Sequence, residues 1–156
     1  MKGNVPQFSS AWSPELKFGF ANVRVPDDHK TGNVHRPGLN WWYALAFFVL
    51  KSHSEERTRD FTVVGGNPLT REAFVQSIRD SHAPSALVYV HGFATNFDQA
   101  LFGLAQIKWD TGYPGIPIVF SWPSRGDRNV FSYNYDRECA EDSDDAFLEV
   151  LRVFEH

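Results

Sequence analysis

The residues around His91 combine types that suit acyl-transfer chemistry. A continuous apolar run, Ala86 to Val90, is followed at once by His91-Gly92-Phe93. Such a run is typical of a strand covered on both faces in a parallel sheet, and ligands bind beyond the carboxyl ends of these strands. Glycine lets the backbone approach a bound group closely. Free amides near Phe93 or Ala94 would then face a developing oxyanion.

A plainer interpretation of Gly92 is a tight turn between a strand and a helix. On the His-Gly dipeptide alone this interpretation is preferable, and the apolar strand before it makes the two equally good. His91 is the best-placed candidate for a general base. A structural role, in which the ring shapes the turn and bonds nearby backbone, is favoured because no activated nucleophile lies close in the sequence.

The nearest hydroxyl groups belong to Ser121 and Ser124, in the loop Ser121-Trp122-Pro123-Ser124. Neither serine has the flanking glycines of a Gly-x-Ser-x-Gly elbow, the turn that presents the nucleophile in α/β hydrolases. Gly126 follows Ser124 by two residues, but Pro123 precedes it. Trp122 is equally suited to lining a pocket and to packing in a core.

Other chemically capable residues have simpler explanations. Asp27, Asp28, His29 and His35 share one loop, but their spacing matches no metal-ligand pattern and a polar turn accounts for them. Asp136 is expected to open the last helix, where a carboxylate favours the helix dipole. The single cysteine, Cys139, is expected to be a small packing residue.

The order of elements predicts the sheet that positions these residues. From Leu87 onward strands and helices alternate, which favours a parallel sheet with right-handed crossovers. Two of the upstream strands, at 47–51 and 61–64, are expected to pair as a hairpin. Strands are predicted at 18–25, 47–51, 61–64, 86–90 and 116–121, and helices at 71–79, 97–111 and 135–154.

Composition narrows the class of protein. Hydrophobic residues make up 42% of the 156 positions and charged residues 22%, which is typical of a globular domain. The net charge of −4 and the lack of a basic run argue against a nucleic-acid partner. One cysteine permits no intrachain disulfide. The longest apolar run, Trp41 to Leu50, is too short to span a bilayer. We therefore expect a cytoplasmic protein with no membrane partner, cofactor or metal.

Several motifs together resemble a group of bacterial α/β hydrolases of uncharacterised function. The resemblance rests on LVYVHGFATNFDQA (Leu87 to Ala100), VFSWPSRG (Val119 to Gly126) and YDRECA (Tyr135 to Ala140). An upstream stretch, FGFANVRVPDDHKTGNVHRP (Phe18 to Pro37), also resembles the leading strand and loop of that group. Because the motifs agree in order and cover most of the chain from Phe18, we treat the resemblance as specific.

The resemblance implies an α/β-hydrolase fold with a Ser–acid–His triad. It implies an oxyanion hole at Gly92, Phe93 and Ala94. It also implies a site mouth lined by His91, Ser121, Trp122 and Ser124. It gives no triad residue in this chain, because the nucleophile elbow belongs on the strand after the last predicted helix.

The expected fold is an incomplete α/β-hydrolase-type sheet, mostly parallel, with an antiparallel N-terminal hairpin and flanking helices. Residues 1–16 are expected to form a flexible leader and residues 17–156 the N-terminal portion of the hydrolase domain. Two functions remain open. One is the first part of an esterase-like serine hydrolase for a small ester-like substrate, inactive as given. The other is a non-catalytic binding or interaction module that self-associates through an open strand edge at 87–90.

Overall fold

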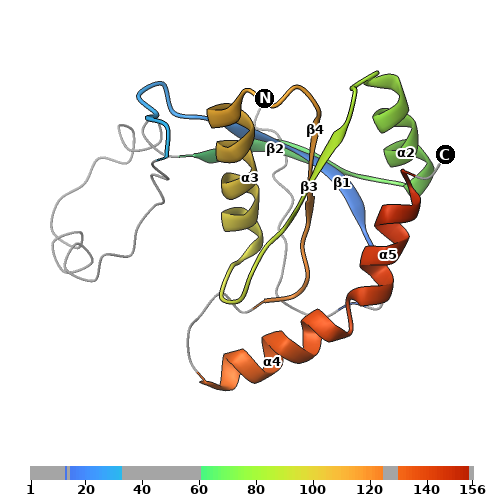
Figure 1. The fold of residues 1–156 in the computed structure, drawn as a ribbon. Helices are drawn as coiled ribbons and strands as arrows, with labels where there is room; N and C mark the ends of the chain where they lie inside the picture. Colours follow the sequence, from blue (N-terminus) through green and yellow to red (C-terminus); the bar gives the residue numbers. More distant parts are fainter. Residues whose placement is uncertain (1–12, 14, 33–60, 125–129, 155–156) are drawn as a thin grey trace, which may run out of the picture.

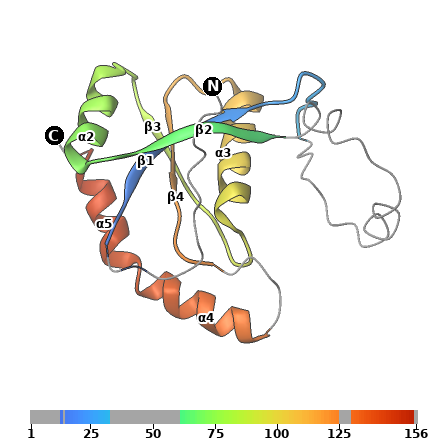
Figure 2. The ribbon, with the colours of Figure 1, turned by 180° about the vertical axis from the view of Figure 1, so that it is seen from behind.

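The computed structural model describes residues 13, 15–32, 61–124 and 130–154. Within them the chain forms four strands and four helices, so the expected α/β class is found, but the strands form one antiparallel and one parallel pair rather than one mostly parallel sheet. In both views, α3 (Phe97–Thr111) lies on the opposite side of the strands from α2 (Arg71–Asp80) and α5 (Asp144–Arg152) (Figures 1 and 2). The strand predicted at 47–51 lies outside the described residues.

An antiparallel pair, β1 (Phe18–Arg24) with β2 (Thr62–Leu69), forms the N-terminal part of the fold. The expected end of the second strand at Gly65 is wrong, because β2 continues through Gly65-Gly66-Asn67-Pro68 to Leu69. Backbone proximity explains the extension: a Cβ atom on Gly19 would lie 2.9 Å from the Asn67 carbonyl oxygen. Pro68 is tolerated because, within the described residues, β2 pairs on one side alone.

The parallel pair predicted from the apolar runs is confirmed. β3 (Ala86–Val90) pairs with β4 (Ile116–Phe120), in register from Ala86 opposite Ile116 to Val90 opposite Phe120. Full burial of β3 was expected but is not found. Its first four residues are half-buried and Val90 is 44% exposed. The reason is that β4 is its only strand partner in the described part of the chain.

Local signals determine where α2 and α3 begin and end. The Thr70 hydroxyl accepts the Ala73 amide at 3.2 Å, as expected for an N-cap. At α3, Asn96 and Gln99 form a reciprocal capping box, and Gly112 ends the helix with φ of 60°. The core face of α3 consists of Ala100, Leu101, Phe102 and Leu104. Trp109, near the end of the same helix, is 63% exposed.

The single helix predicted for 135–154 is wrong, because two helices occupy that region. α4 (Val130–Glu141) ends before α5 begins at Asp144. At the break the Ser143 hydroxyl donates to the Cys139 carbonyl at 2.6 Å, and a side chain that bonds backbone in this way competes with helix continuation. The break lets both helices pack on one core. That core is formed by Phe120, Trp122, Cys139 and Val150.

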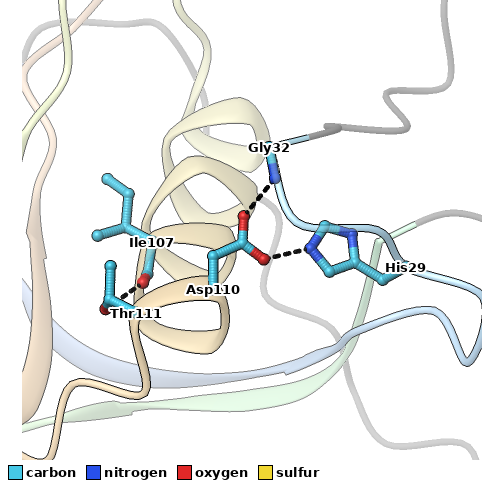
Figure 3. A network of polar contacts seen from close by, with 5 residues as sticks. All are labelled: His29, Gly32, Ile107, Asp110 and Thr111. Atoms are coloured by element: carbon cyan, nitrogen blue, oxygen red, sulfur yellow. Dashed lines mark hydrogen bonds and ion pairs between the residues drawn. The ribbon is translucent and has the colours of Figure 1, made fainter.

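A buried hydrogen bond between His29 and Asp110 joins the loop after β1 to α3 (Figure 3). His29 Nε2 lies 2.7 Å from Asp110 Oδ1, and the Gly32 amide donates to Asp110 Oδ2 at 2.9 Å. The His29 side chain is 2% exposed, and its ring meets Phe61 edge-on. The sequence predicts only a polar turn at His29, whereas in the structure His29 and Gly32 attach this loop to Asp110 on α3. Within the described segments, no group of three residues able to hold a metal ion is found.

Asp110 predicts a specific acid sensitivity of the fold. The Gly32 amide, helped by His29, holds the pKa of Asp110 below its ordinary value of 3.8 although burial raises it. Because the folded pKa is the lower one, this carboxylate stabilises the protein above about pH 3.8. That contribution is lost as the pH falls through the folded pKa. We expect the free energy of unfolding, measured with urea, to fall less for Asp110→Asn than for the parent when the pH is lowered from about 5 to about 3. Asp98→Asn, exposed on the same helix, is the control; equal pH dependence in parent and Asp110→Asn would contradict the assignment.

No helix within the described residues has both the length and the apolar character needed to cross a membrane.

Candidate active site at the carboxyl ends of β3 and β4

The candidate site lies where the two parallel strands end. Because Val90 is opposite Phe120, the residues that follow, His91 and Ser121, start their loops at the same edge of the sheet. Both strands run downward in Figure 1, and α4 lies below their carboxyl ends. Ligands bind at this edge in open α/β sheets. All the site residues expected from the sequence lie on these two loops.

His91 joins the two loops. Its side chain is buried, with Nδ1 3.0 Å from the Gly92 carbonyl oxygen. Nε2 lies 3.0 Å from Ser121 Oγ and 3.1 Å from the Trp122 carbonyl oxygen. The Trp122 indole returns a hydrogen bond to the His91 carbonyl at 2.9 Å, and the two rings stack at 4.9 Å. The loops after β3 and β4 are thus held together by hydrogen bonds in both directions and by one stacked ring pair.

These contacts decide what His91 is able to do. Both ring nitrogens face carbonyl oxygens, which only accept hydrogen bonds. A nitrogen that donates to a carbonyl cannot also remove a proton from Ser121. With the ring proton on Nδ1, the ring donates to the Gly92 carbonyl and Nε2 is left to accept from the Ser121 hydroxyl; with the proton on Nε2, the ring donates to the Trp122 carbonyl. In either tautomer His91 positions the two loops.

The turn formed by Gly92, Phe93 and Ala94, here called the oxyanion turn, has an unusual backbone. Ala94 has φ of 56°, a left-handed conformation that costs a residue with a side chain about 1–2 kcal/mol. Its amide is already used, since it donates to Asp136 Oδ2 at 3.3 Å. The Phe93 amide makes no hydrogen bond to any described residue. Of the amides near Phe93 and Ala94 that were expected to face an oxyanion, the Phe93 amide is therefore the better placed.

Gly92 is not required by the fold of the described residues. Its φ is not positive, and a Cβ atom there would meet no described residue within 4 Å. Glycine at this position is therefore unexplained by backbone conformation or by packing. Open space beside the turn is what a bound group needs. The Phe93 side chain is 39% exposed at the same place and meets the Tyr133 ring edge-on, with centroids 5.3 Å apart.

Asp136 is the site residue that sequence reasoning missed. Expected at the opening of a helix, it lies well inside α4 and is only 1% exposed. Its Oδ2 atom accepts both the Ala94 amide and the Ser124 hydroxyl, the latter at 2.6 Å. The spacing of small and polar residues in the sequence could have indicated that Asp136 is buried. The buried residues Ser132, Asp136, Cys139 and Ser143 are four, three and four positions apart, which is one face of a helix.

The residues after β4 have different environments. Ser121 is half-buried beside His91, and Ser124 is buried against Asp136. Trp122 belongs to the core, packed with Phe120, Cys139 and Val150. Of its two expected roles, core packing is the one that the structure describes. Trp122 also reaches the site through its indole bond to His91.

The described residues contain a backbone donor that suits acyl-transfer chemistry, but they contain no nucleophile elbow. The Phe93 amide, which makes no hydrogen bond to a described residue, lies at the carboxyl end of a parallel strand. In the described residues Ser121 lies 3.0 Å from His91 Nε2, but it lacks the flanking glycines of a nucleophile elbow.

Comparisons with known proteins identify the family of this chain. The family model described as "Alpha/beta hydrolase of unknown function (DUF900)" matches residues 68–156, which is more than half of the chain and contains the whole candidate site. No curated protein matches the chain, and no solved structure does. The resemblance expected from the motifs is confirmed: this chain belongs to the DUF900 family of alpha/beta hydrolases.

Proposed function

We propose that the chain provides the oxyanion turn of an esterase-like serine hydrolase that acts on a small ester-like substrate. The observation that carries the proposal is the Phe93 amide. It makes no hydrogen bond to a described residue, and it lies between His91 and Ala94, each of which is held by bonds to the neighbouring loop or helix. A preorganised donor of this kind stabilises negative charge that develops in the transition state.

The nucleophile, its acid and the catalytic histidine are proposed to lie outside residues 1–156. Two observations support this. The sequence contains no Gly-x-Ser-x-Gly pattern. Of the two serines nearest the turn, Ser124 is buried against Asp136 and Ser121 lies in a Pro-containing loop without flanking glycines. Residues 1–156 alone are then an oxyanion half-site without turnover.

Covalent labelling tests the proposal directly. Residues 1–156 and the full product of the gene are each treated with a fluorophosphonate probe and assayed with p-nitrophenyl butyrate. We expect the full product to be labelled on one serine and to hydrolyse the ester, and residues 1–156 to do neither. Peptide mapping identifies the labelled serine. Labelling of Ser121 or Ser124 would overturn the location of the nucleophile, and an inert full product would overturn the proposed function.

A second candidate function is a non-catalytic interaction module, supported by the exposed strand. Val90 is 44% exposed, and within the described residues β3 pairs with β4 alone. An apolar strand with unpaired backbone groups favours pairing with another chain. The proposed partner is a second copy of this chain.

Self-association of residues 1–156 follows from that edge. We expect size-exclusion chromatography with light scattering to show a mass that rises with concentration between about 1 and about 100 µM. Val88→Lys, which places a charge on β3, is expected to reduce the association. A monomer across the whole range would contradict the interaction module and would leave the proposed hydrolase unaffected.

A further inference from the structure

We infer that Asp136 is a positioning residue for the oxyanion turn, holding the Ala94 amide so that the Phe93 amide stays available to substrate. The inference rests on the proposed function and adds a residue to it from α4, an element outside both strand loops. Asp136 is 1% exposed, and its Oδ2 atom is the acceptor for groups on both loops. One carboxylate oxygen therefore fixes the turn after β3 relative to the loop after β4.

The conformation of Ala94 shows why the turn needs holding. A left-handed φ of 56° is unfavourable for alanine, so the turn relaxes unless a bond made in this conformation opposes the strain. Among the described residues, Asp136 makes the one hydrogen bond of the Ala94 amide. A carboxylate forms stronger bonds of this kind than a neutral acceptor does. Asp136 is thus the group that opposes the strain.

The neighbouring peptide is affected because the two amides are linked through one residue. If Ala94 returns to a negative φ, the Phe93–Ala94 peptide group rotates, and through the Phe93 Cα atom this rotation reaches the Gly92–Phe93 peptide group that carries the Phe93 N–H. The carbonyl oxygen of that same group faces His91 Nδ1 at 3.0 Å. Loss of Asp136 releases the Ala94 end of the turn, so the contact at Gly92 is left to set the direction of the Phe93 N–H. Misplacing a catalytic donor by about 1 Å lowers rates by on the order of 10²-fold.

Amide signals of the isolated chain test the structural half of the inference. In ¹⁵N-labelled residues 1–156 we expect Asp136→Ala to accelerate hydrogen exchange of the Ala94 amide and to shift both the Phe93 and Ala94 resonances. Asp136→Asn, which keeps an acceptor oxygen, is expected to retain most of the protection. Glu138→Gln removes the same charge from an exposed position on the same helix and is the matched control. Unchanged Phe93 and Ala94 signals in Asp136→Ala would overturn the inference.

Kinetics of the full gene product test the functional half. We expect Asp136→Ala to lower kcat for p-nitrophenyl butyrate by on the order of 10- to 100-fold with KM within about threefold, because a transition-state contact is affected. The decisive comparison adds Ala94→Gly. Glycine adopts a left-handed φ without strain, so Asp136→Ala is expected to lower kcat several-fold less in the Ala94→Gly background.

The outcomes separate the inference from the proposed function. A full product without turnover overturns the proposed function, and the amide signals then decide alone whether Asp136 holds the turn. If Asp136→Ala lowers kcat by the same factor in the parent and in the Ala94→Gly background, the positioning role is overturned, because the loss then has another cause. If the Asp136→Ala protein does not fold, Asp136→Asn replaces it. We then expect a smaller loss of kcat, which is again less in the Ala94→Gly background than in the parent.

Discussion

Replacing Gly115 with alanine is expected to lower the free energy of unfolding by about 3 kcal/mol, the upper end of the usual cost of overpacking. A Cβ atom at this position would overlap the Ser85 carbonyl oxygen and come within 2.6 Å of the Tyr113 ring. The ring is able to move, but the Ser85 carbonyl is backbone and is fixed by the Ile116 amide, which donates to it at 2.9 Å.

The position matters because it starts the parallel pair. Ser85 precedes β3, and Ile116 is the first residue of β4. Lys108, near the end of α3, donates to the carbonyls of both Tyr113 and Gly115, so the loop is held on its other side as well. A methyl group at residue 115 therefore pushes β4 away from β3 at the beginning of their register. Urea unfolding followed by tryptophan fluorescence measures the loss.

Gly92→Ala is the matched control for this prediction. The same methyl group at Gly92 meets no described residue within 4 Å, and the backbone there needs no positive φ. We expect its unfolding midpoint to equal that of the parent, while turnover by the full gene product falls because the methyl enters the site. A Gly115→Ala protein as stable as the parent would show that the start of β4 is not as closely packed as described.

Much of the fold was predictable because its signals are local. The apolar runs indicated β3 and β4 with their parallel pairing, and Thr70 and Gly112 indicated helix ends through capping. The failures involve long-range packing. The end of β2 at Gly65 was misjudged because only contact with β1 shows why Gly-Gly-Asn-Pro continues as strand. The break at Ser143 was missed because its hydroxyl bond to Cys139 depends on where the two helices pack.

The site was predictable in position but not in its bonding. Gly92, Phe93 and Ala94 follow from a strand, a turn and a resemblance, all of which are visible in the sequence. That Ala94 donates its amide to Asp136 follows from α4 lying below the strand ends, and no sequence period encodes that arrangement. His29 and Asp110 are a similar case: 81 residues separate them, and each alone has a plain explanation as a surface residue.

The second large effect concerns a single backbone group. Substituting phenyllactic acid for Phe93 turns its amide into an ester and removes the N–H while keeping the side chain. The Phe93 N–H makes no hydrogen bond to any described residue, so the exchange affects stability only through the Gly92 carbonyl, which becomes an ester carbonyl and a weaker acceptor for the His91 ring; we expect a small fall in the unfolding midpoint. Removal of one oxyanion donor lowers kcat by about 10²- to 10³-fold. The same exchange at Ala94, whose amide bonds Asp136, is expected to lower stability as well and serves as the contrast.

The value of kcat for p-nitrophenyl butyrate in the full gene product, with and without the Phe93 N–H, therefore decides whether Phe93 is the oxyanion donor. We expect a loss of about 10²- to 10³-fold in kcat with little change in stability. Equal kcat in the amide and ester forms would contradict the assignment of Phe93 as the oxyanion donor.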